Sequence, residues 1–448
     1  MSYLLSIVVL ILLGFVIGAS PTSVLGSTQG ISPATASLLV AALGIALVGL
    51  VLQGSQNQRT RWILAAGLVF RLGLTGVRYA FDGTSFDSDS FFYRSQASEL
   101  LDAMGAGWWP PGGPSAYVSG PAGGNDWISL LIAWIYKFVG TDMYTSFVFM
   151  SGIAFLGTIA FVRAIRASYA SDRATEIFAA MLSFAPSIAV WTATGKDAVL
   201  FASLGFIVMA WFEYLDNRLS VFGVAGAAIF GLAGVLIRPH IILLVAGALL
   251  ISLFVSRGVS EGRRLLGMVM GTVGVAFLIA ASRGLVGGVS VAEAITAASE
   301  RSAFDDAVIT PSNPLTPIGY LQSALTVYVR PYPWEVVHVF SFLAALEGII
   351  VATMIGAVAY WRRRIVNAVG VARSLFLVSY LAVAIFAFGT VGNLGVIARQ
   401  RVQITPMLFL LVSVGIASRG QALTGMATTD ETGQVAHSDP TAREVKVG

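Results

Sequence analysis

One short segment concentrates the acids that could do chemistry. Residues 86–100 read FDSDSFFYRSQASEL and carry Asp87, Asp89 and Glu99, in a chain of which only 11% is charged. A carboxylate can take a proton from an attacking hydroxyl, or it can bind a divalent cation such as Mg or Mn. The triplet Asp87-Ser88-Asp89 has the D-x-D form that can hold such a metal, although this triplet also occurs often by chance. Asp89 and Asp87 are therefore the candidate catalytic residues, and the same pair is the candidate metal site.

A structural explanation accounts for part of this segment. The spacing of apolar residues predicts an amphipathic helix over 89–104. Ser88 or Ser90 would cap such a helix, and Asp89 near its N-terminus would favour the helix dipole. This explains one acid, but it does not explain why Asp87 and Asp89 occur together with Asp82.

A set of basic residues forms the second chemical signal. They stand at the predicted outer ends of apolar spans and are Lys196, Arg238, Arg330, Arg399 and Arg401. Charges at membrane depth are costly and indicate function by default. We expect them to form a cationic pocket that holds a phosphate or pyrophosphate. The alternative is that each one extends to lipid headgroups or pairs with a nearby acid, as Asp197 would with Lys196.

Four further residues on the same predicted face are candidates for substrate binding. They are Tyr93, His240, Glu335 and His338. For the two histidines, a structural hydrogen bond is the alternative explanation. The chain has no cysteine, which excludes disulfides, thiolate metal sites and cysteine nucleophiles. It also lacks the HExxH and GxxxxGK[ST] motifs.

The elements that must position these residues are apolar helices. The chain has 448 residues, is 56% hydrophobic and has a mean hydropathy of +0.81. Continuous apolar runs of about 18 to 22 residues recur along it, each long enough to cross a hydrocarbon core of about 30 Å. We therefore predict an all-α integral membrane protein with about twelve transmembrane helices; a β-barrel would instead show alternating patterns. The excess of four positive charges is usual for a membrane protein, and nothing suggests nucleic acid.

The predicted spans alternate across a plasma membrane. They cover about 3–20, 34–53, 62–80, 143–162, 174–191, 196–214, 219–237, 240–256, 265–282, 336–360, 372–391 and 402–418. The short basic loops at 55–61, 163–173, 216–218, 256–264 and 361–365 are then cytoplasmic. The alternation holds only if the apolar segment 126–139 does not cross. We therefore expect that segment to be an amphipathic helix at the extracytoplasmic interface.

This topology divides the chain into four regions. Residues 1–61 hold two spans, and residues 62–260 form a module with a large outer loop at 81–142. Residues 261–420 hold the remaining spans with an outer loop at 283–335. Residues 421–448 are polar and are expected to be a disordered cytoplasmic tail. Because the large loops share one face, chemistry or recognition is expected on the extracytoplasmic side.

Within residues 62–260 the order of motifs resembles the GT-C membrane glycosyltransferases. An acidic outer loop is followed by the pattern Asp89, Tyr93, Ala97 and Leu100, then by LIAWIYKFVG (131–140) and the basic loop FVRAIR (161–166). The segment FAPSIAVWTATGKDAVL (184–200) is similar to the family's span that ends in Pro before a short outer turn with an Asp. Two features depart from the family: two spans precede the module, and its usual Asp-Glu pair is replaced by Asp-Ser-Asp.

The resemblance implies a sugar donor linked to polyprenyl phosphate, with membrane lipids around it. It also implies transfer on the exported face to a cell-envelope glycan, lipid or protein acceptor. In this family an outer-loop Asp acts as base or helps to hold a metal, and the pattern favours Asp89 over Asp87. The basic residues would then stabilise the leaving phosphate.

Three other classes of protein remain open. A polysaccharide polymerase or ligase that uses undecaprenyl-diphosphate oligosaccharides would also have about a dozen spans and outward arginines. A lipid-sugar flippase or transporter would place charges deep in its spans, where this chain has few, Glu213 and Glu347 being the main exceptions. A non-enzymatic scaffold for envelope assembly would not need the outer acids at all.

Overall fold

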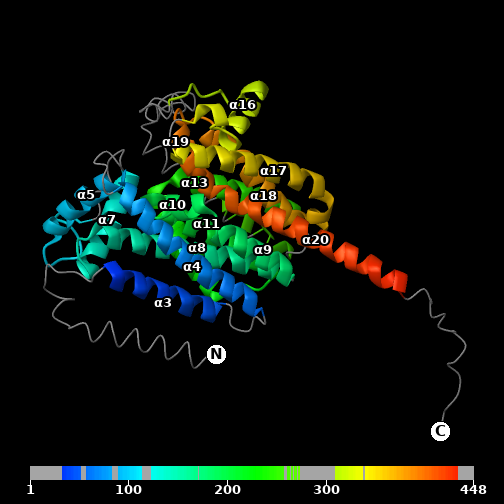
Figure 1. The fold of residues 1–448 in the computed structure, drawn as a ribbon, viewed down its shortest axis with the longest axis horizontal. Coiled ribbons are helices and arrows are strands. Elements are labelled where there is room, and N and C mark those ends of the chain that lie inside the picture. Colours follow the sequence, from blue (N-terminus) through cyan, green and yellow to red (C-terminus); the bar gives the residue numbers. More distant parts are fainter. Residues whose placement is uncertain are drawn as a thin grey trace, which may run out of the picture.

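The computed structural model is built from helices, many of which run roughly along one direction (Figure 1). It describes residues 33–51, 57–82, 89–113, 123–169, 171–256, parts of 260–272, 308–336 and 339–431. Of these described residues 84% are helical, and none belongs to a strand. The prediction of an all-α protein is therefore confirmed at the level of fold class.

Among the described residues, five helices are long and apolar enough to cross a membrane. They are α4 (Gln58–Asp82), α8 (Met143–Ser168), α11 (Gly195–Leu215), α17 (Val339–Val369) and α18 (Val371–Phe388). A sixth results if α19 (Leu394–Gln400) and η2 (Arg401–Gln403) are counted with α20 (Thr405–Glu431), across a bend of 51°. The predicted total of about twelve spans is not confirmed.

Several predicted spans are shorter or broken. Residues 174–191 form two helices, α9 (Asp172–Ser183) and α10 (Pro186–Trp191), because Pro186 has no N–H to continue the first helix. The runs 219–237 and 240–256 form α12 (Val221–Ile237) and α13 (Pro239–Val255), each of 17 residues. The run 34–53 corresponds to α3 (Pro33–Val51). Residues 3–20, and most of 265–282, lie outside the described residues.

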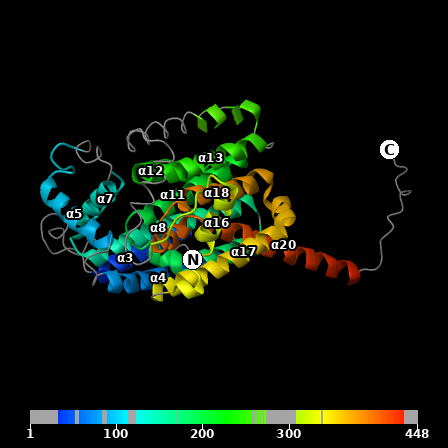
Figure 2. The ribbon, with the colours of Figure 1, turned by 90° about the horizontal axis from the view of Figure 1, so that it is seen from above.

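The predicted interfacial elements form a pair of helices at one end of the bundle. The amphipathic helix expected at 89–104 is α5 (Asp89–Met104), and α7 (Gly123–Val139) contains the segment 126–139. The two helices pack together, at the end opposite to the far end of α20 (Figures 1 and 2). The buried face of α5 carries Tyr93, Ala97, Leu100 and Met104, which repeat at helical spacing.

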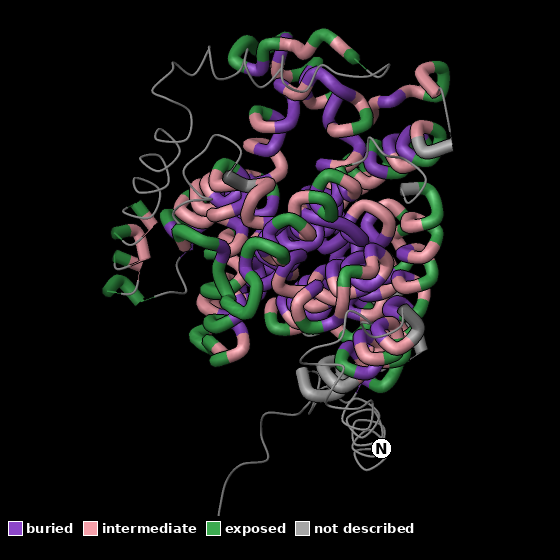
Figure 3. The backbone as a smooth tube through the Cα atoms, turned by 90° about the vertical axis from the view of Figure 1, so that its left-hand side faces the viewer, coloured by how far each residue is buried: buried purple, intermediate pink, exposed green. Residues whose placement is uncertain are grey.

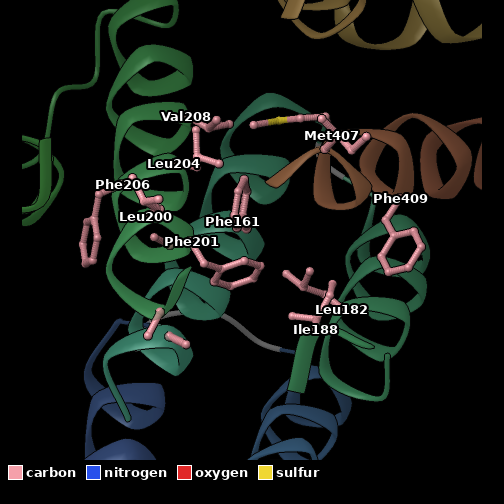
Figure 4. Close-up of a cluster of buried hydrophobic side chains, with 14 of the residues drawn as sticks. Phe161, Leu182, Ile188, Leu200, Phe201, Leu204, Phe206, Val208, Met407 and Phe409 are labelled. Carbon is pink, nitrogen blue, oxygen red and sulfur yellow. The ribbon is translucent and has the colours of Figure 1, made fainter. Parts of the chain in front are cut away.

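The core lies between α8 and α11. At Gly157 and Gly205 the two backbones approach so closely that a Cβ on Gly205 would lie 2.5 Å from the Gly157 carbonyl oxygen. Small residues at such a crossing are typical of helix packing in lipid. Around it, Phe161 and Phe201 pack edge to face, and α9, α10 and α20 add further apolar side chains (Figure 4). Buried residues concentrate in this central region (Figure 3). The start of α11, where the charged residues lie, is thus fixed to the core.

The later part of the chain adds α16 (Pro317–Tyr328), η1 (Pro333–Glu335) and the helices from α17 onward. Helix α20 continues to Glu431, so residues 421–431, expected to be unstructured, are helical instead. Residues 432–448 lie outside the described part of the chain, as do residues 283–307 of the second predicted outer loop.

Candidate functional site

The site begins at the first residue of α5. The Asp89 carboxylate accepts a hydrogen bond of 2.6 Å from Nη1 of Arg399, a residue 310 positions further along the chain in α19. The Asp89 side chain is 53% exposed, whereas the Arg399 side chain is only 16% exposed. A half-exposed acid is therefore held against a mostly buried guanidinium, where it can still meet a ligand from solvent.

Asp197, in the first turn of α11, connects this pair to a second arginine. Its carboxylate is fully buried, and Oδ2 accepts a hydrogen bond from Nε of Arg399. Oδ1 lies 3.7 Å from Nη1 of Arg238, which stands between α12 and α13. Since Asp197 contacts both guanidinium groups, it fixes their positions relative to each other.

Lys196 and Tyr93 complete this side of the site. Lys196 Nζ lies 3.5 Å, and the Tyr93 hydroxyl 3.4 Å, from Oδ1 of Asn125, which both can donate to. Tyr93 fits here because its neighbour Gly195 has no side chain: a Cβ at Gly195 would lie 2.7 Å from the tyrosine ring. Gly195 also has φ of +55°, a left-handed conformation that glycine adopts readily.

Two further residues lie around Arg238. Its Nη1 donates a 2.6 Å hydrogen bond to Oε1 of Gln400, which also accepts one from Gln403. His240, the second residue of α13, is close enough to feel the charges of Arg238 and Lys196. We call Asp89, Lys196, Asp197, Arg238 and Arg399 the charge cluster.

The charge cluster has one more cation than anion. Burial alone would raise the pKa of Asp89, but Arg399, Lys196 and Arg238 outweigh it and hold the pKa below its ordinary value. Burial and the nearby Asp89 charge raise the pKa of Tyr93, which stays protonated. Nη2 of Arg399 is buried and has no hydrogen-bond partner. The arrangement can therefore receive an anion beside an ionised carboxylate.

Two of the five predicted cations do not join the charge cluster. Arg401 is fully buried and donates to two main-chain carbonyls, those of Val327 and Ala344, each at 2.9 Å. Its expected role in phosphate binding is not supported, because it is fully buried and two carbonyl groups take up its Nε and Nη1 donors. Arg401 instead joins η2 to α17 and to the end of α16.

Arg330 and Glu335 pair with each other. Nε of Arg330 donates to both carboxylate oxygens, at 3.0 and 3.2 Å, and the Tyr332 main-chain N–H adds a bond of 2.8 Å. Although burial alone would raise the pKa of Glu335, these bonds lower it overall. The pair closes a turn before α17, so its expected roles toward donor and substrate are not supported.

The remaining predicted residues concern the metal and one histidine. Asp87 and His338 lie outside the described residues, so neither is placed. Among the described residues, no group of three or more His, Cys, Asp or Glu side chains could hold a metal ion. The carboxylates of Asp89 and Asp197 each accept a hydrogen bond from Arg399, so these two acids do not fit a metal site. We derive no step through a metal.

Three residues of the site were not identified as such from the sequence. Asp197 was considered only as a neutralising neighbour of Lys196, yet its hydrogen bond is to Arg399. Asn125 and Gln400 carried no signal, because uncharged amides are common at helix ends. The available signal was the position of Asp197, an acid in the first turn of a mostly apolar helix.

Comparison with known proteins identifies no relative. No family model, curated protein or solved structure matches the chain. The site therefore has to be interpreted from its own geometry.

Proposed function

We propose that this chain is a membrane glycosyltransferase. It would move a sugar from a polyprenyl-phosphate carrier to a hydroxyl of an envelope glycan, lipid or protein on the exported face. The observation that supports this best is the half-exposed Asp89 carboxylate beside Arg399, Arg238 and Lys196. It combines a proton acceptor with cations for a phosphate, and this reaction needs both.

Asp89 serves as the general base in this proposal. As the acceptor hydroxyl attacks the anomeric carbon, it must lose its proton, and a carboxylate within hydrogen-bond reach can take it. The lowered pKa of Asp89 keeps the carboxylate ionised at neutral pH and available as an acceptor. Its exposed side leaves room for the acceptor to approach.

The cations stabilise the leaving phosphate. Breaking the bond between the anomeric carbon and the phosphate oxygen leaves negative charge on the carrier, which fixed cations offset. Arg399 has a free donor, Nη2, and Asp197 keeps its guanidinium in place. Lys196 and Arg238 add positive charge from two other elements.

Donor binding would also activate the base. When a phosphate binds at Nη2 of Arg399, its negative charge offsets the cations that lower the pKa of Asp89. Burial then prevails and raises the pKa of Asp89. The acid thus becomes a stronger base only when the donor is present, which limits wasteful reaction of the free protein.

The test is turnover by the purified full-length protein in detergent with a polyprenyl-phosphate sugar. Asp89→Asn and Asp89→Ala should reduce transfer by about 10²- to 10⁴-fold while the protein remains folded. Glu99→Gln is the matched control, since Glu99 is an exposed acid on the same helix and should not matter. Full activity in the Asp89 variants would contradict the proposed base.

The same assay separates the other classes. Transfer without a sealed bilayer rules out a protein that only transports or flips its lipid. Use of undecaprenyl-diphosphate oligosaccharides alone would instead identify a polymerase or ligase. If the protein transfers no sugar from any lipid-linked donor, only the transport and scaffold hypotheses remain.

A further inference from the structure

A second candidate site lies beside Arg401, whose Nη1 donates to the carbonyl of the lining residue Ala344. A cavity of about 340 Å³ is formed between α10, α17 and α20. Its walls are mostly apolar and include Met181, Val190, Val351, Met354 and Phe409. This volume is within the range of about 300–1,000 Å³ found for small-molecule sites.

The cavity has a few polar groups in its wall. Ser187 on α10 donates a 2.7 Å hydrogen bond to Oε1 of Glu347 on α17, and both residues line the cavity. Arg401 is fully buried beside it, bonded to the carbonyl of the lining residue Ala344. Its charge acts on Glu347, and its Nη2 has no hydrogen-bond partner.

The cavity opens beside exposed apolar side chains of α17. Leu343, Leu346 and Ile350 line it and are 47%, 47% and 45% exposed. Helix α17 is long and apolar enough to cross a membrane and runs beside α20 (Figures 1 and 2). Such exposed side chains on a spanning helix face hydrocarbon, so a ligand would enter from the bilayer.

We propose that this cavity binds a neutral single-chain lipid alcohol. The apolar walls take its hydrocarbon chain, and its hydroxyl donates a hydrogen bond to the Glu347 carboxylate. Because Glu347 lines the cavity and the Arg401 charge acts on it, an uncharged head avoids repulsion from both groups. A phosphate head would meet the carboxylate, and an ammonium head would meet the guanidinium. The inference does not depend on the proposed function of the charge cluster.

Photolabelling of the full-length protein in nanodiscs tests the proposal. The probe is a long-chain primary alcohol with a diazirine in its chain, and labelled peptides are identified by mass spectrometry. Labels are expected on α10, α17 and α20 around the cavity. Unlabelled alcohol should compete about tenfold better than an alkyl phosphate or an alkyl ammonium of equal chain length. Equal competition by all three amphiphiles would overturn the proposal.

Two substitutions on α17 provide a matched pair. Ile349 and Ile350 are neighbours of similar exposure, 49% and 45%, but of the two only Ile350 belongs to the cavity wall. Ile350→Trp should therefore reduce labelling about tenfold, whereas Ile349→Trp should leave it unchanged. Equal loss in both variants would mean that the probe reports only the lipid-facing surface.

A third substitution tests the head group. Glu347→Gln keeps the size of the side chain but leaves the Arg401 charge unbalanced. The alkyl phosphate should then compete about as well as the alcohol, and the ammonium should still compete poorly. An unchanged order of competition in this variant would contradict a role for the carboxylate in recognising the ligand.

Discussion

Helix α11 carries a charged site near each end, and the two sites differ in kind. Asp197 in the first turn and Glu213 near the last are both buried acids, separated by about 24 Å at 1.5 Å per residue. Glu213 bonds Nε of Arg163 at 2.8 Å and accepts two bonds from Ser220, which itself caps α12. Asp197 instead lies between Arg399 and Arg238.

The difference shows how a binding site can be told from a structural ion pair. At Glu213 one acid meets one base, and the other carboxylate oxygen is occupied by the start of the next helix. In the charge cluster the cations outnumber the acids, Arg399 keeps a donor without a partner, and Asp89 stays half exposed. The excess positive charge and the half-exposed carboxylate of Asp89 distinguish the charge cluster from the ion pair at Glu213.

The largest expected effect comes from removing the two buried acids. Asp197→Ala should reduce the free energy of unfolding by about 3–5 kcal/mol, because it removes the buried acid that Arg399 and Arg238 share. Glu213→Ala should cost less, because its partner Arg163 is 28% exposed and water can reach it. Thermal unfolding in detergent measures this loss. Transfer by the folded fraction should disappear only in Asp197→Ala. Loss of transfer in both variants would remove the functional distinction between the two ends of α11.

The next effect concerns the arginines. Arg399→Lys keeps the charge but loses the planar donor group, so KM for the lipid-linked donor should rise about tenfold or more. Arg163→Lys makes the matched change at the other end of α11 and should leave KM unchanged. Steady-state kinetics on both variants provide the comparison. An unaltered KM in Arg399→Lys would place the donor elsewhere.

A pH dependence of transfer follows from the Asp89–Arg399 contact. In the free protein the pKa of Asp89 is lowered, so the carboxylate and its ion pair persist until the pH falls through that lowered pKa. With the donor bound, the phosphate charge offsets the nearby cations and the pKa of Asp89 should rise. Since kcat reports the complex and kcat/KM the free protein, the acidic limb of kcat should lie at the higher pH. Coincident limbs would contradict activation of the base by the donor.

The smallest effect is expected at the Arg330–Glu335 pair. Glu335→Gln should cost about 0–1 kcal/mol of stability, because the pair is local and partly exposed. The pKa of Glu335 is lowered, so its contribution is present at neutral pH and is lost as the pH falls through that pKa. Transfer should not change. A strong loss of transfer would indicate that Arg330 and Glu335 do belong to the candidate site.

The sequence predicts where helices begin and end better than it predicts which side chains contact one another. Helix α5 begins and ends where its apolar spacing predicts, because one face must be buried and Asp89 favours its N-terminus. The run 174–191 looked like one span because hydropathy averages over Pro186, which ends that helix. Hydropathy also does not show where an apolar run bends, as at the 51° break before α20.

The two arginines at 399 and 401 show why the site was only partly predictable. Residues two positions apart point about 200° away from each other around a helix, so they cannot both face one pocket. The predicted topology places both arginines at the outer end of a span, but it does not show which of them faces the site. Arg399 meets Asp197 and Asp89, whereas Arg401 turns to the carbonyls of Val327 and Ala344. Because α16 and α17 supply the carbonyl groups that bind Arg401, Arg399 is the arginine that can contact a ligand.

The length of the apolar part of α17 can be compared with the thickness of a membrane's hydrocarbon core. Its apolar part, residues 339–360, is about 33 Å long, close to a hydrocarbon core of about 30 Å. Arg362, Arg363 and Arg364 follow soon after, and in a spanning α17 they would reach the lipid phosphates. Anionic lipids would attract each of them by about 1 kcal/mol. A thinner or less anionic bilayer would therefore tilt or shift α17, and the wall of the cavity would move with it.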